Sequence, residues 1–265
     1  MPEKLQNLLI MQKKISGLAI VAVLTCSSVT VVRGQISTLP KWEIGAAAGP
    51  FIYQGDLAPS VVGSFKLVSA GGMLYASRII NRSFSLRTSL VLAELRGDDR
   101  KYGREEWRQA RGLRFRTTAF EVAESVVYDI FGNNGNRMRF SPYVFAGIGY
   151  SFLRVRRNAS RFDSAYFAAR QGERFITGLK ADMKRNPPGG VLIVPVGVGV
   201  RYVLTPAWSV NLEADYRFSE TDYLDGFSRV GNDGRNDHYY SIMLGVLFRI
   251  LPGKGVKCPE LPEKL

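Results

Sequence analysis

The alternation of apolar and polar residues is the clearest pattern in the chain, and it is sharpest between Trp208 and Phe218. In this stretch every even-numbered residue is apolar and every odd-numbered residue is polar or charged. A strand sends successive side chains to opposite faces, whereas a helix would mix the two sets around its circumference. Aromatic residues stand at the two ends of the apolar face, with aliphatic residues between them, as on a strand that crosses a bilayer. The stretch therefore predicts a membrane-spanning β-strand.

The same alternation recurs along the chain and predicts eight strands. Their expected ranges are 41–53, 66–79, 84–95, 113–131, 140–152, 191–204, 208–218 and 238–250. The connections alternate between long and short, with short turns after the second, fourth and sixth strands. An even number of strands with tight turns at one end and long loops at the other is typical of outer-membrane barrels. We therefore expect an all-β, eight-stranded antiparallel transmembrane β-barrel of up-and-down topology, with short periplasmic turns and long extracellular loops.

Two residues do not fit the strands that contain them. Glu124 falls on the apolar side of the fourth strand, where a carboxylate would be costly in lipid. We therefore expect either a bulge that shifts the register at this point or a wrong assignment of that strand. Pro195 lies inside the sixth strand, although proline cannot donate a hydrogen bond to a β-ladder. The segments 97–112, 153–190 and 219–237 are expected to be long loops.

The polar faces of the predicted strands are rich in glycine, serine and scattered charge. An eight-stranded barrel is filled by its own side chains, so the charged residues of these faces would meet inside it. We expect an internal ion-pair network, and no open pore, from Glu43, Arg87, Glu121, Asp129, Arg201, Glu213, Asp215, Arg217 and Arg249. The alternative is a soluble lipocalin-like barrel or a sandwich, which would place its apolar side chains inside.

The N-terminus has the features of an export signal. Lys13 and Lys14 form a basic head, 15–24 is apolar, and small or polar residues follow, with cleavage expected between 28 and 35. A transmembrane helix is the alternative, but the apolar run is short of the roughly 20 residues that a helix needs to span a bilayer. Lipidation at Cys26 is a second alternative. The expected organisation is a signal peptide at 1–34, an outer-membrane barrel at 41–251 and a periplasmic C-terminal tail at 252–265.

Charge and cysteine content narrow the function classes. The net charge is +13, which is typical of nucleic-acid binders, but the basic residues gather in expected loops. A surface that faces lipid phosphates explains the same charge, so no nucleic-acid partner is expected. The chain has two cysteines, Cys26 and Cys258, and one histidine, without metal-ligand spacing. Because Cys26 lies in the segment expected to be removed, we expect no intrachain disulfide. Because the cysteines and the histidine lack metal-ligand spacing, we expect no metal, and we expect no other cofactor.

The longest expected loop is strongly basic. Between 154 and 185 it contains nine basic residues against three acidic ones. Arginine matches the geometry of phosphate groups, and long loops are where a barrel carries its function. The alternative is a charged loop that is only solvated. We hypothesise that this loop contacts lipopolysaccharide phosphates through Arg156, Arg157, Arg161, Arg170 and Arg174.

Carboxylates and the single histidine offer two further candidate sites. Asp222, Asp225, Asp233 and Asp237 could bind calcium through their oxygens, although such residues more often cap turns. His238 lies close in sequence to Ser241 and to acidic residues, as in small outer-membrane deacylases and proteases. A catalytic triad is recognised by geometry and not by composition, and a lone histidine at the start of a strand is usually structural. We therefore expect no enzymatic activity and no metal.

Several motifs resemble one known family. The chain contains Trp42-Glu43-Ile44-Gly45, then Tyr53-Gln54-Gly55-Asp56-Leu57, and later Thr221-Asp222-Tyr223-Leu224-Asp225. In these motifs it resembles the outer-membrane barrel family that includes PorG of the type IX secretion system. The continuation Gly226-Phe227-Ser228 departs from the family's usual sequence. The signature residues are Trp42, Glu43, Gly45, Gly55, Asp56, Leu57, Thr221, Asp222, Tyr223, Leu224 and Asp225.

The resemblance implies a non-enzymatic component of the Gram-negative outer membrane that anchors the periplasmic ring of the type IX secretion system. Its expected partners are outer-membrane lipid, lipopolysaccharide and the proteins of that ring. The C-terminal tail, which contains Cys258, and the short turns are the expected contact surface for a periplasmic partner. A general structural or adhesive barrel is the main alternative, and an outer-membrane hydrolase is the other.

Overall fold

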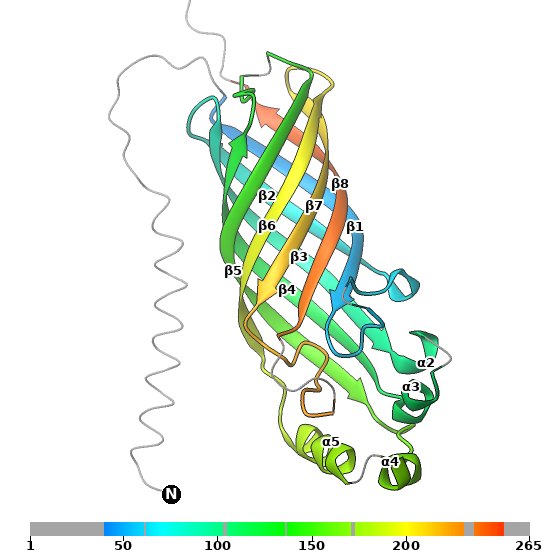
Figure 1. The fold of residues 1–265 in the computed structure, drawn as a ribbon. Coiled ribbons are helices and arrows are strands. Elements are labelled where there is room, and N and C mark those ends of the chain that lie inside the picture. Colours follow the sequence, from blue (N-terminus) through cyan, green and yellow to red (C-terminus); the bar gives the residue numbers. More distant parts are fainter. Residues whose placement is uncertain are drawn as a thin grey trace, which may run out of the picture. The chain divides into compact units, whose positions relative to one another are not determined.

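Eight antiparallel strands close into one barrel, in which each strand pairs with its neighbours in the sequence and β1 pairs with β8 (Figure 1). The computed structural model describes residues 40–60, 62–102, 105–135, 137–170, 173–230 and 236–251. The expected signal peptide and C-terminal tail lie outside these residues. The strands are β1 (Trp42–Gln54), β2 (Ser69–Ile79), β3 (Phe84–Asp98), β4 (Arg114–Asp129), β5 (Phe140–Asn158), β6 (Gly190–Val203), β7 (Trp208–Ser219) and β8 (His238–Ile250). The predicted fold class is confirmed.

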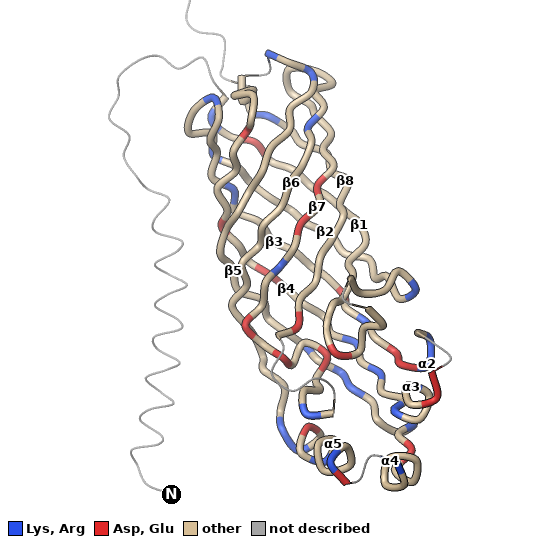
Figure 2. The backbone as a smooth tube through the Cα atoms, viewed as in Figure 1, with Lys and Arg blue, Asp and Glu red and all other residues tan. Residues whose placement is uncertain are grey.

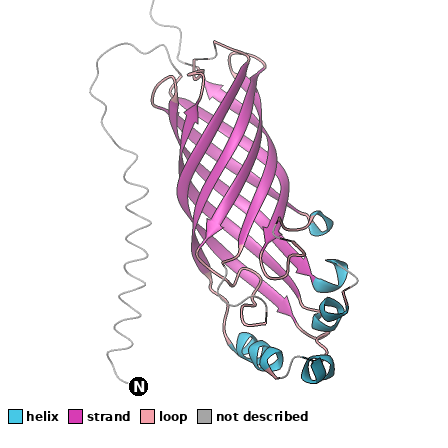
Figure 3. Ribbon diagram, in the orientation of Figure 1, coloured by secondary structure: helices cyan, strands magenta, loops and turns pink. Residues whose placement is uncertain are grey.

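The two ends of the barrel differ as the connections predict. The turn end carries the short connections after β2, β4 and β6, and the loop end carries the long ones. All the described helices lie at the loop end (Figure 3). They are η1 (Phe65–Leu67), α2 (Asp99–Tyr102), α3 (Glu106–Arg111), α4 (Ser164–Arg170) and α5 (Arg174–Lys184). None of these helices has both the length and the apolar character needed to cross a bilayer.

The outer wall of the barrel is a belt of exposed apolar side chains. Leu74, Ile148 and Leu244 are 61%, 61% and 66% exposed. On β8 the apolar face runs from Tyr240 to Ile250, which at ~3.4 Å per residue and a tilt near ~40° spans roughly 26 Å of the barrel axis. That height matches the apolar band of transmembrane barrels. Because the apolar residues of the belt face outward, the alternative of a soluble barrel is wrong.

Three strands continue past the closed barrel at the loop end. The last pair between β2 and β3 joins Gly71 to Ala93, and the last pair between β5 and β6 joins Phe152 to Gly190. Beyond these points the strands pair only with each other through β4. We call this three-stranded sheet the extension; it consists of 94–98, 114–118 and 154–158.

Two segments that were expected to be loops contain parts of the extension and helices. Segment 97–112 contains the end of β3, α2 and α3, and segment 153–190 contains the end of β5, α4 and α5. The alternation of side chains continues there with its polarity reversed, because charged residues now face outward and apolar ones inward. A search for strands with an outward apolar face therefore stops too early.

Glu124 points to the lipid-facing side without any bulge. It pairs with Thr88 on β3 and with Ile148 on β5 in an unbroken register. The Thr88 hydroxyl donates a hydrogen bond to the Glu124 carboxylate at 2.7 Å. Both explanations expected from the sequence, a bulge and a misassigned strand, are therefore wrong, and a local hydrogen bond accommodates the carboxylate instead.

Prolines interrupt two ladders. Pro195 lies within β6 as predicted, and the β5–β6 ladder skips Gly147 and Ile148 beside it. On β1, Pro50 and Gly49 are likewise skipped in the pairing with β8. Both gaps follow from the missing N–H of proline, which removes one ladder hydrogen bond.

Candidate functional site

The inside of the barrel at the turn end holds a carboxylate between two arginines. The Glu43 side chain, 1% exposed, accepts a hydrogen bond from Arg249 Nε at 2.7 Å and an ion-pair contact from Arg201 Nη2 at 3.3 Å. Arg249 also contacts Glu43 through Nη2. Arg249 stands directly opposite Glu43 on the neighbouring strand β8, whereas Arg201 comes from β6, so its ion pair joins strands that are not adjacent. The predicted internal network is present at this level.

A second group surrounds Glu213 on β7. Its carboxylate accepts hydrogen bonds from Arg87 Nη1 at 2.9 Å, Tyr143 Oη at 2.5 Å and Asn211 Nδ2 at 2.8 Å. The guanidinium of Arg87 also stacks over the Tyr75 ring, 4.7 Å from its centroid. Aromatic rings therefore fill the space between the charges, which is how a narrow barrel is packed without water.

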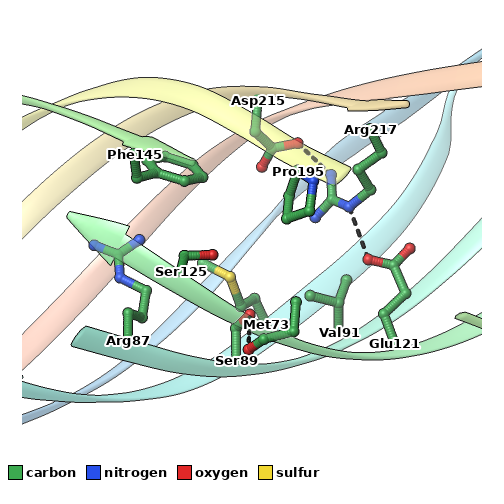
Figure 4. A pocket seen from close by; sticks show the side chains of 11 residues that line it. Met73, Arg87, Ser89, Val91, Glu121, Ser125, Phe145, Pro195, Asp215 and Arg217 are labelled. Carbon is green, nitrogen blue, oxygen red and sulfur yellow. Dashed lines mark hydrogen bonds and ion pairs between the residues drawn. The ribbon is translucent and has the colours of Figure 1, made fainter. Parts of the chain in front are cut away.

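A third group lies nearer the loop end. Arg217 Nε donates to Glu121 at 2.7 Å, and the same guanidinium pairs with Asp215 (Figure 4). Tyr239 Oη donates to Glu121 at 2.5 Å, and Ser241 Oγ donates to Asp215 at 2.9 Å. The cavity between this group and Arg87 measures only about 20 Å³, which is room for about one water molecule. Side chains therefore fill most of the lumen at this level.

Asp129 was predicted to belong to the internal ion-pair network, and this part of the prediction is wrong. It is buried, but within the described residues it forms no ion pair. Its Oδ1 accepts hydrogen bonds from the backbone N–H groups of Phe131 at 3.1 Å and Asn133 at 2.9 Å. The hydroxyl of Ser141 donates to its other oxygen. Asp129 thus shapes the turn after β4 instead of joining the ion pairs.

The loop end is closed by a packed cluster that joins two signature motifs. Leu57 follows β1 and Leu224 follows β7, and both are fully buried in the same hydrophobic core. Phe227 and Val230 join them, and the inner face of the extension contributes Phe115 and its neighbours. We call this cluster the mouth cluster; its buried apolar members are Leu57, Leu95, Leu113, Phe115, Leu224, Phe227 and Val230.

Two buried carboxyl groups share one phenol inside the mouth cluster. Tyr53 Oη lies 2.6 Å from Asp237 Oδ1 and 2.9 Å from Asp225 Oδ2. A phenol carries a single hydrogen, so it can donate to only one of the two carboxyl groups. The second contact requires a proton on a carboxyl group, which then donates to the phenolic oxygen. Gly55 belongs here because a Cβ at this position would collide with both Asp237 and Tyr53.

The pKa values of both carboxyl groups follow from their surroundings. Burial raises the pKa of Asp225 well above its usual range, and the charges of Asp237 and Asp56 raise it further. Burial likewise raises the pKa of Asp237, while the hydrogen bond from Tyr53 works against this. The pair therefore keeps a proton to higher pH than an isolated aspartate does.

Two further aspartates hold the cluster to the surrounding helices. Asp99 accepts hydrogen bonds from Arg111 at 2.7 and 2.8 Å, and Arg111 also donates to the carbonyl of Asp56 at 3.2 Å. Asp182 on α5 accepts from the backbone N–H groups of Ser228 at 3.2 Å and Val230 at 3.1 Å. Sequence reasoning missed both aspartates, since each bonds to residues 12 or more positions away in the chain.

A family model, described as a domain of unknown function (DUF6089), matches residues 18–249. The chain belongs to this family. Among solved structures it resembles Neisserial surface protein A, with 14% identity over 79% of this chain and 97% of that one and a TM-score of 0.44. It resembles Ail, the attachment invasion locus protein of Yersinia pestis, with 11% identity over 80% and 99% and a TM-score of 0.42.

A third similar structure is a major outer membrane protein from Thermus thermophilus, with 12% identity over 79% of this chain and 99% of that one and a TM-score of 0.43. No curated protein matches the sequence of this DUF6089 member.

The signature residues of this DUF6089 member divide between the two ends of the barrel. Glu43 lies inward at the turn end, and Trp42 lies beside it on the outer wall. Gly45 faces inward, where a Cβ would collide with the Tyr75 ring. The remaining signature residues are at the loop end, where 55–57 and 221–225 meet. The structure thus gives the two motifs separate packing roles.

The five arginines predicted to contact lipopolysaccharide are not equivalent. Arg157 is committed to the protein, because its guanidinium donates to the carbonyls of Gly226 at 2.7 Å and Arg185 at 2.6 Å. Arg170 pairs with Glu106 at 2.6 Å at the surface. The other three, Arg156, Arg161 and Arg174, have exposed side chains. Lipopolysaccharide contact by this set stays a prediction.

The two alternative sites do not assemble in the described chain. His238 and Ser241 lie on opposite faces of β8, with Ser241 inside and His238 half-exposed against Tyr216 and Phe218. Two of the aspartates considered for calcium act in hydrogen bonds instead: Asp237 accepts from the Leu224 N–H at 3.0 Å, and Asp225 accepts from the Phe227 N–H at 2.7 Å. Within the described residues no three His, Cys, Asp or Glu side chains form a metal-binding group, and Asp233 lies outside them.

Proposed function

We propose that this DUF6089 protein is a non-enzymatic barrel of the Gram-negative outer membrane that anchors a periplasmic protein ring, as the PorG-like motifs imply for type IX secretion. The apolar belt supports the membrane location. The observation that carries the anchoring role is the rigid rim at the turn end, which faces the periplasm when the long loops face outward.

The rim is held together by side-chain amides that link one turn to the next. Asn133 exchanges hydrogen bonds with the backbone of Met138, at 2.6 and 2.8 Å. Asn134 reaches the neighbouring turn, where its amide donates to the carbonyl of Asn81 at 2.9 Å and its backbone N–H donates to Arg82 at 3.1 Å. Two separate turns therefore form one preorganised surface, which lowers the entropic cost of binding a partner.

Apolar side chains on this rim are exposed. Ile80, Phe131 and Met138 are 62%, 51% and 45% exposed, and Leu204 on the third turn is 57% exposed. Exposed apolar residues rimmed by polar ones are typical of protein-contact surfaces. The small cavity inside the barrel and the separation of His238 from Ser241 support a structural role over a catalytic or conducting one.

Deletion of the gene in the native cell, followed by a survey of secreted proteins, tests this function. We expect loss of secreted proteins from the medium and rescue by the wild-type chain. Unchanged secretion would reject the anchoring role and favour the general structural or adhesive barrel. Turnover of lipid A or peptide substrates that is lost in His238→Ala would instead favour the hydrolase.

Photo-crosslinking from the rim locates the partner. A crosslinkable residue at Phe131 or Met138 should capture a periplasmic protein, whereas the same residue at Ile148, in the apolar belt, should capture none. Equal capture from both places would contradict the assignment of the rim as the contact surface.

A further inference from the structure

The outer face of the extension is a basic wall. Figure 2 shows basic residues along the strand ends that lead to the helices. Five arginines and two carboxylates, Glu94 and Asp98, share this face, which gives it a formal charge of +3, from five positive charges less two. The arginines of the basic wall are Arg96, Arg114, Arg116, Arg154 and Arg156.

Three of these arginines stand in one row across the sheet. Arg96 is directly opposite Arg116, and Arg116 is directly opposite Arg156. Like charges opposite one another destabilise a sheet. The inner face of the extension, packed by Phe115 and Leu95 in the mouth cluster, holds the strands in this register despite the repulsion. Repulsion between these arginines therefore destabilises the sheet, and an anion bound on the outer side of the row would reduce that repulsion.

Of the two carboxylates on this face, Asp98 is buried and accepts a hydrogen bond from the backbone N–H of Arg100 at 3.1 Å. Among the described residues, only Glu94 forms ion pairs with the arginines of the wall. Glu94 pairs with Arg116 Nε at 2.7 Å and also with Arg96. The side chain of Arg116 remains 49% exposed and that of Arg96 remains 42% exposed. Within the described part of the chain, Arg154 and Arg156 form no ion pair, and their side chains are exposed. The guanidinium groups of the wall thus have donors to spare for an external anion.

The wall begins where the apolar belt ends. Phe120 and Phe152 stack on the outer surface with their centroids 6.2 Å apart, as aromatic residues do at the edge of a bilayer. Arg154 follows Phe152 by two positions and Arg116 precedes Phe120 by four, which places them roughly 5 and 10 Å farther along the barrel axis. The polar headgroup layer on each side of a bilayer is roughly 5–8 Å thick. Arg154 is therefore at the depth of lipid phosphates, and Arg116 lies just beyond that layer, within reach of its long side chain.

We propose that the basic wall binds the phosphate groups of a bisphosphorylated glycolipid in the outer leaflet. Arginine offers a planar fork that binds phosphate through two parallel hydrogen bonds, and several forks on a stiff sheet can hold two phosphates at once. The acyl chains of the same lipid would lie against Phe120, Phe152 and the rest of the belt. This site rests on the proposed outer-membrane location. It lies on strands, and it shares only Arg156 with the five arginines predicted to contact lipopolysaccharide from the basic loop.

Lipid retention measures this site directly. The full-length chain is inserted into zwitterionic phosphatidylcholine vesicles that contain either bisphosphorylated lipid A or the same lipid without phosphates. After mild detergent extraction, native mass spectrometry counts the lipid A molecules that stay bound. We expect at least tenfold more retention of the phosphorylated form. Equal retention of both forms would overturn the proposal.

Matched variants distinguish binding at the basic wall from a general effect of net charge on lipid A retention. The triple variant Arg116→Gln, Arg154→Gln, Arg156→Gln should lose at least tenfold in retention of bisphosphorylated lipid A. The control replaces three exposed arginines of the turn end by Gln and should stay within twofold of wild type. An equal loss in both triples would overturn the wall as the site. The control residues are Arg82, Arg137 and Arg139.

A variant that is expected to increase lipid A retention distinguishes loss of the binding site from misfolding. Glu94→Gln removes the carboxylate that competes for Arg96 and Arg116, so lipid A retention should rise severalfold. A fall in retention would contradict the proposal. Protease protection in vesicles without lipid A is measured for every variant. A chain that inserts but shows no preference for phosphate rejects the wall alone, whereas failure to insert rejects the membrane location and the wall together.

Discussion

The extension continues three of the eight strands that form the apolar belt, with opposite polarity. In the belt, β4 turns Val122 and Val126 outward and Glu121 and Ser125 inward. In the extension the same strand turns Arg116 outward and Phe115 inward. Neither the pairing nor the register changes between the two regions. The two regions differ in what lies outside the barrel, since the belt faces hydrocarbon and the extension faces water and headgroups.

The contrast teaches that the reversal of polarity marks the bilayer edge more directly than the end of a strand does. Across the belt, most charged side chains lie inside and are paired, and Glu124 is an exception on the outer face. In the extension, the apolar mouth cluster takes that inner place. Four experiments test this division, and they are ordered by the size of the expected effect.

The largest difference is expected between inner and outer carboxylates. Glu43→Ala leaves Arg201 and Arg249 buried without their partner, and breaking a buried pair costs about 3–5 kcal/mol of unfolding free energy. Glu94→Ala at the surface of the extension should cost less than ~1 kcal/mol. Denaturant unfolding of the barrel in vesicles measures both. Equal losses would mean that the lumen charges are as well solvated as the surface ones.

A charge placed on the outer face should distinguish the two regions directly. Val122→Lys puts an ammonium in the belt and should cost about 2–4 kcal/mol. Thr118→Lys, four positions away on the same face of β4 and opposite Glu94, should change stability by less than ~0.5 kcal/mol. The same unfolding assay compares them. A similar cost at both positions would place Thr118 within the hydrocarbon layer.

The mouth cluster should loosen as the pH rises. Asp225 and Asp237 have raised pKa values in the closed cluster, so its stability is complete below the unfolded pKa near ~4 and is lost as the pH rises through the folded value. Hydrogen-exchange protection factors at 224–230 should fall between pH 5 and pH 8 by roughly tenfold, which is about 1.4 kcal/mol.

Asp237→Asn serves as the control for this pH dependence. The amide can donate to Tyr53 Oη, as a protonated carboxyl group would, so the variant should keep the cluster closed at both pH values. A pH dependence in the variant as steep as in the wild type would assign the effect to other groups.

The smallest effect is expected at Glu124. The carboxylate is costly on the lipid-facing side, and Thr88 offsets part of that cost through its hydroxyl. Thr88→Val alone should destabilise the barrel by ~1 kcal/mol, because the carboxylate loses its donor. Adding Glu124→Leu should recover at least that amount, since replacing both partners by apolar groups removes the penalty. No recovery in the double variant would show that Glu124 is solvated at this position.

The sequence predicted the belt and the lumen well, because both follow from a period of two. The predicted range of β8 is the observed one, and eight of the nine lumen charges take part in ion pairs. The extension was missed for the same reason, since beyond Phe152 the apolar side chains no longer face lipid. Asp129 was misjudged because its turn partners depend on local geometry and not on alternation.

The mouth cluster could not be predicted from local pattern. Its contacts join 55–57 to 221–225, and nothing in either segment specifies the other. The resemblance marked both motifs as important, but their meeting around Tyr53 became visible only in three dimensions. Asp99 and Asp182 lay in expected loops and carried no signal of their buried roles.

The pairing of β1 with β8 has a consequence for how this barrel assembles. The other pairings join neighbouring strands, whereas this seam brings together Trp42 and Ile250, so it bears the largest loop-closure entropy and should form last. Until it forms, β1 and β8 are open edges that can pair with another chain. The gap at Gly49 and Pro50 removes pairs from this last ladder, so a catalyst of barrel insertion would act where β1 meets β8.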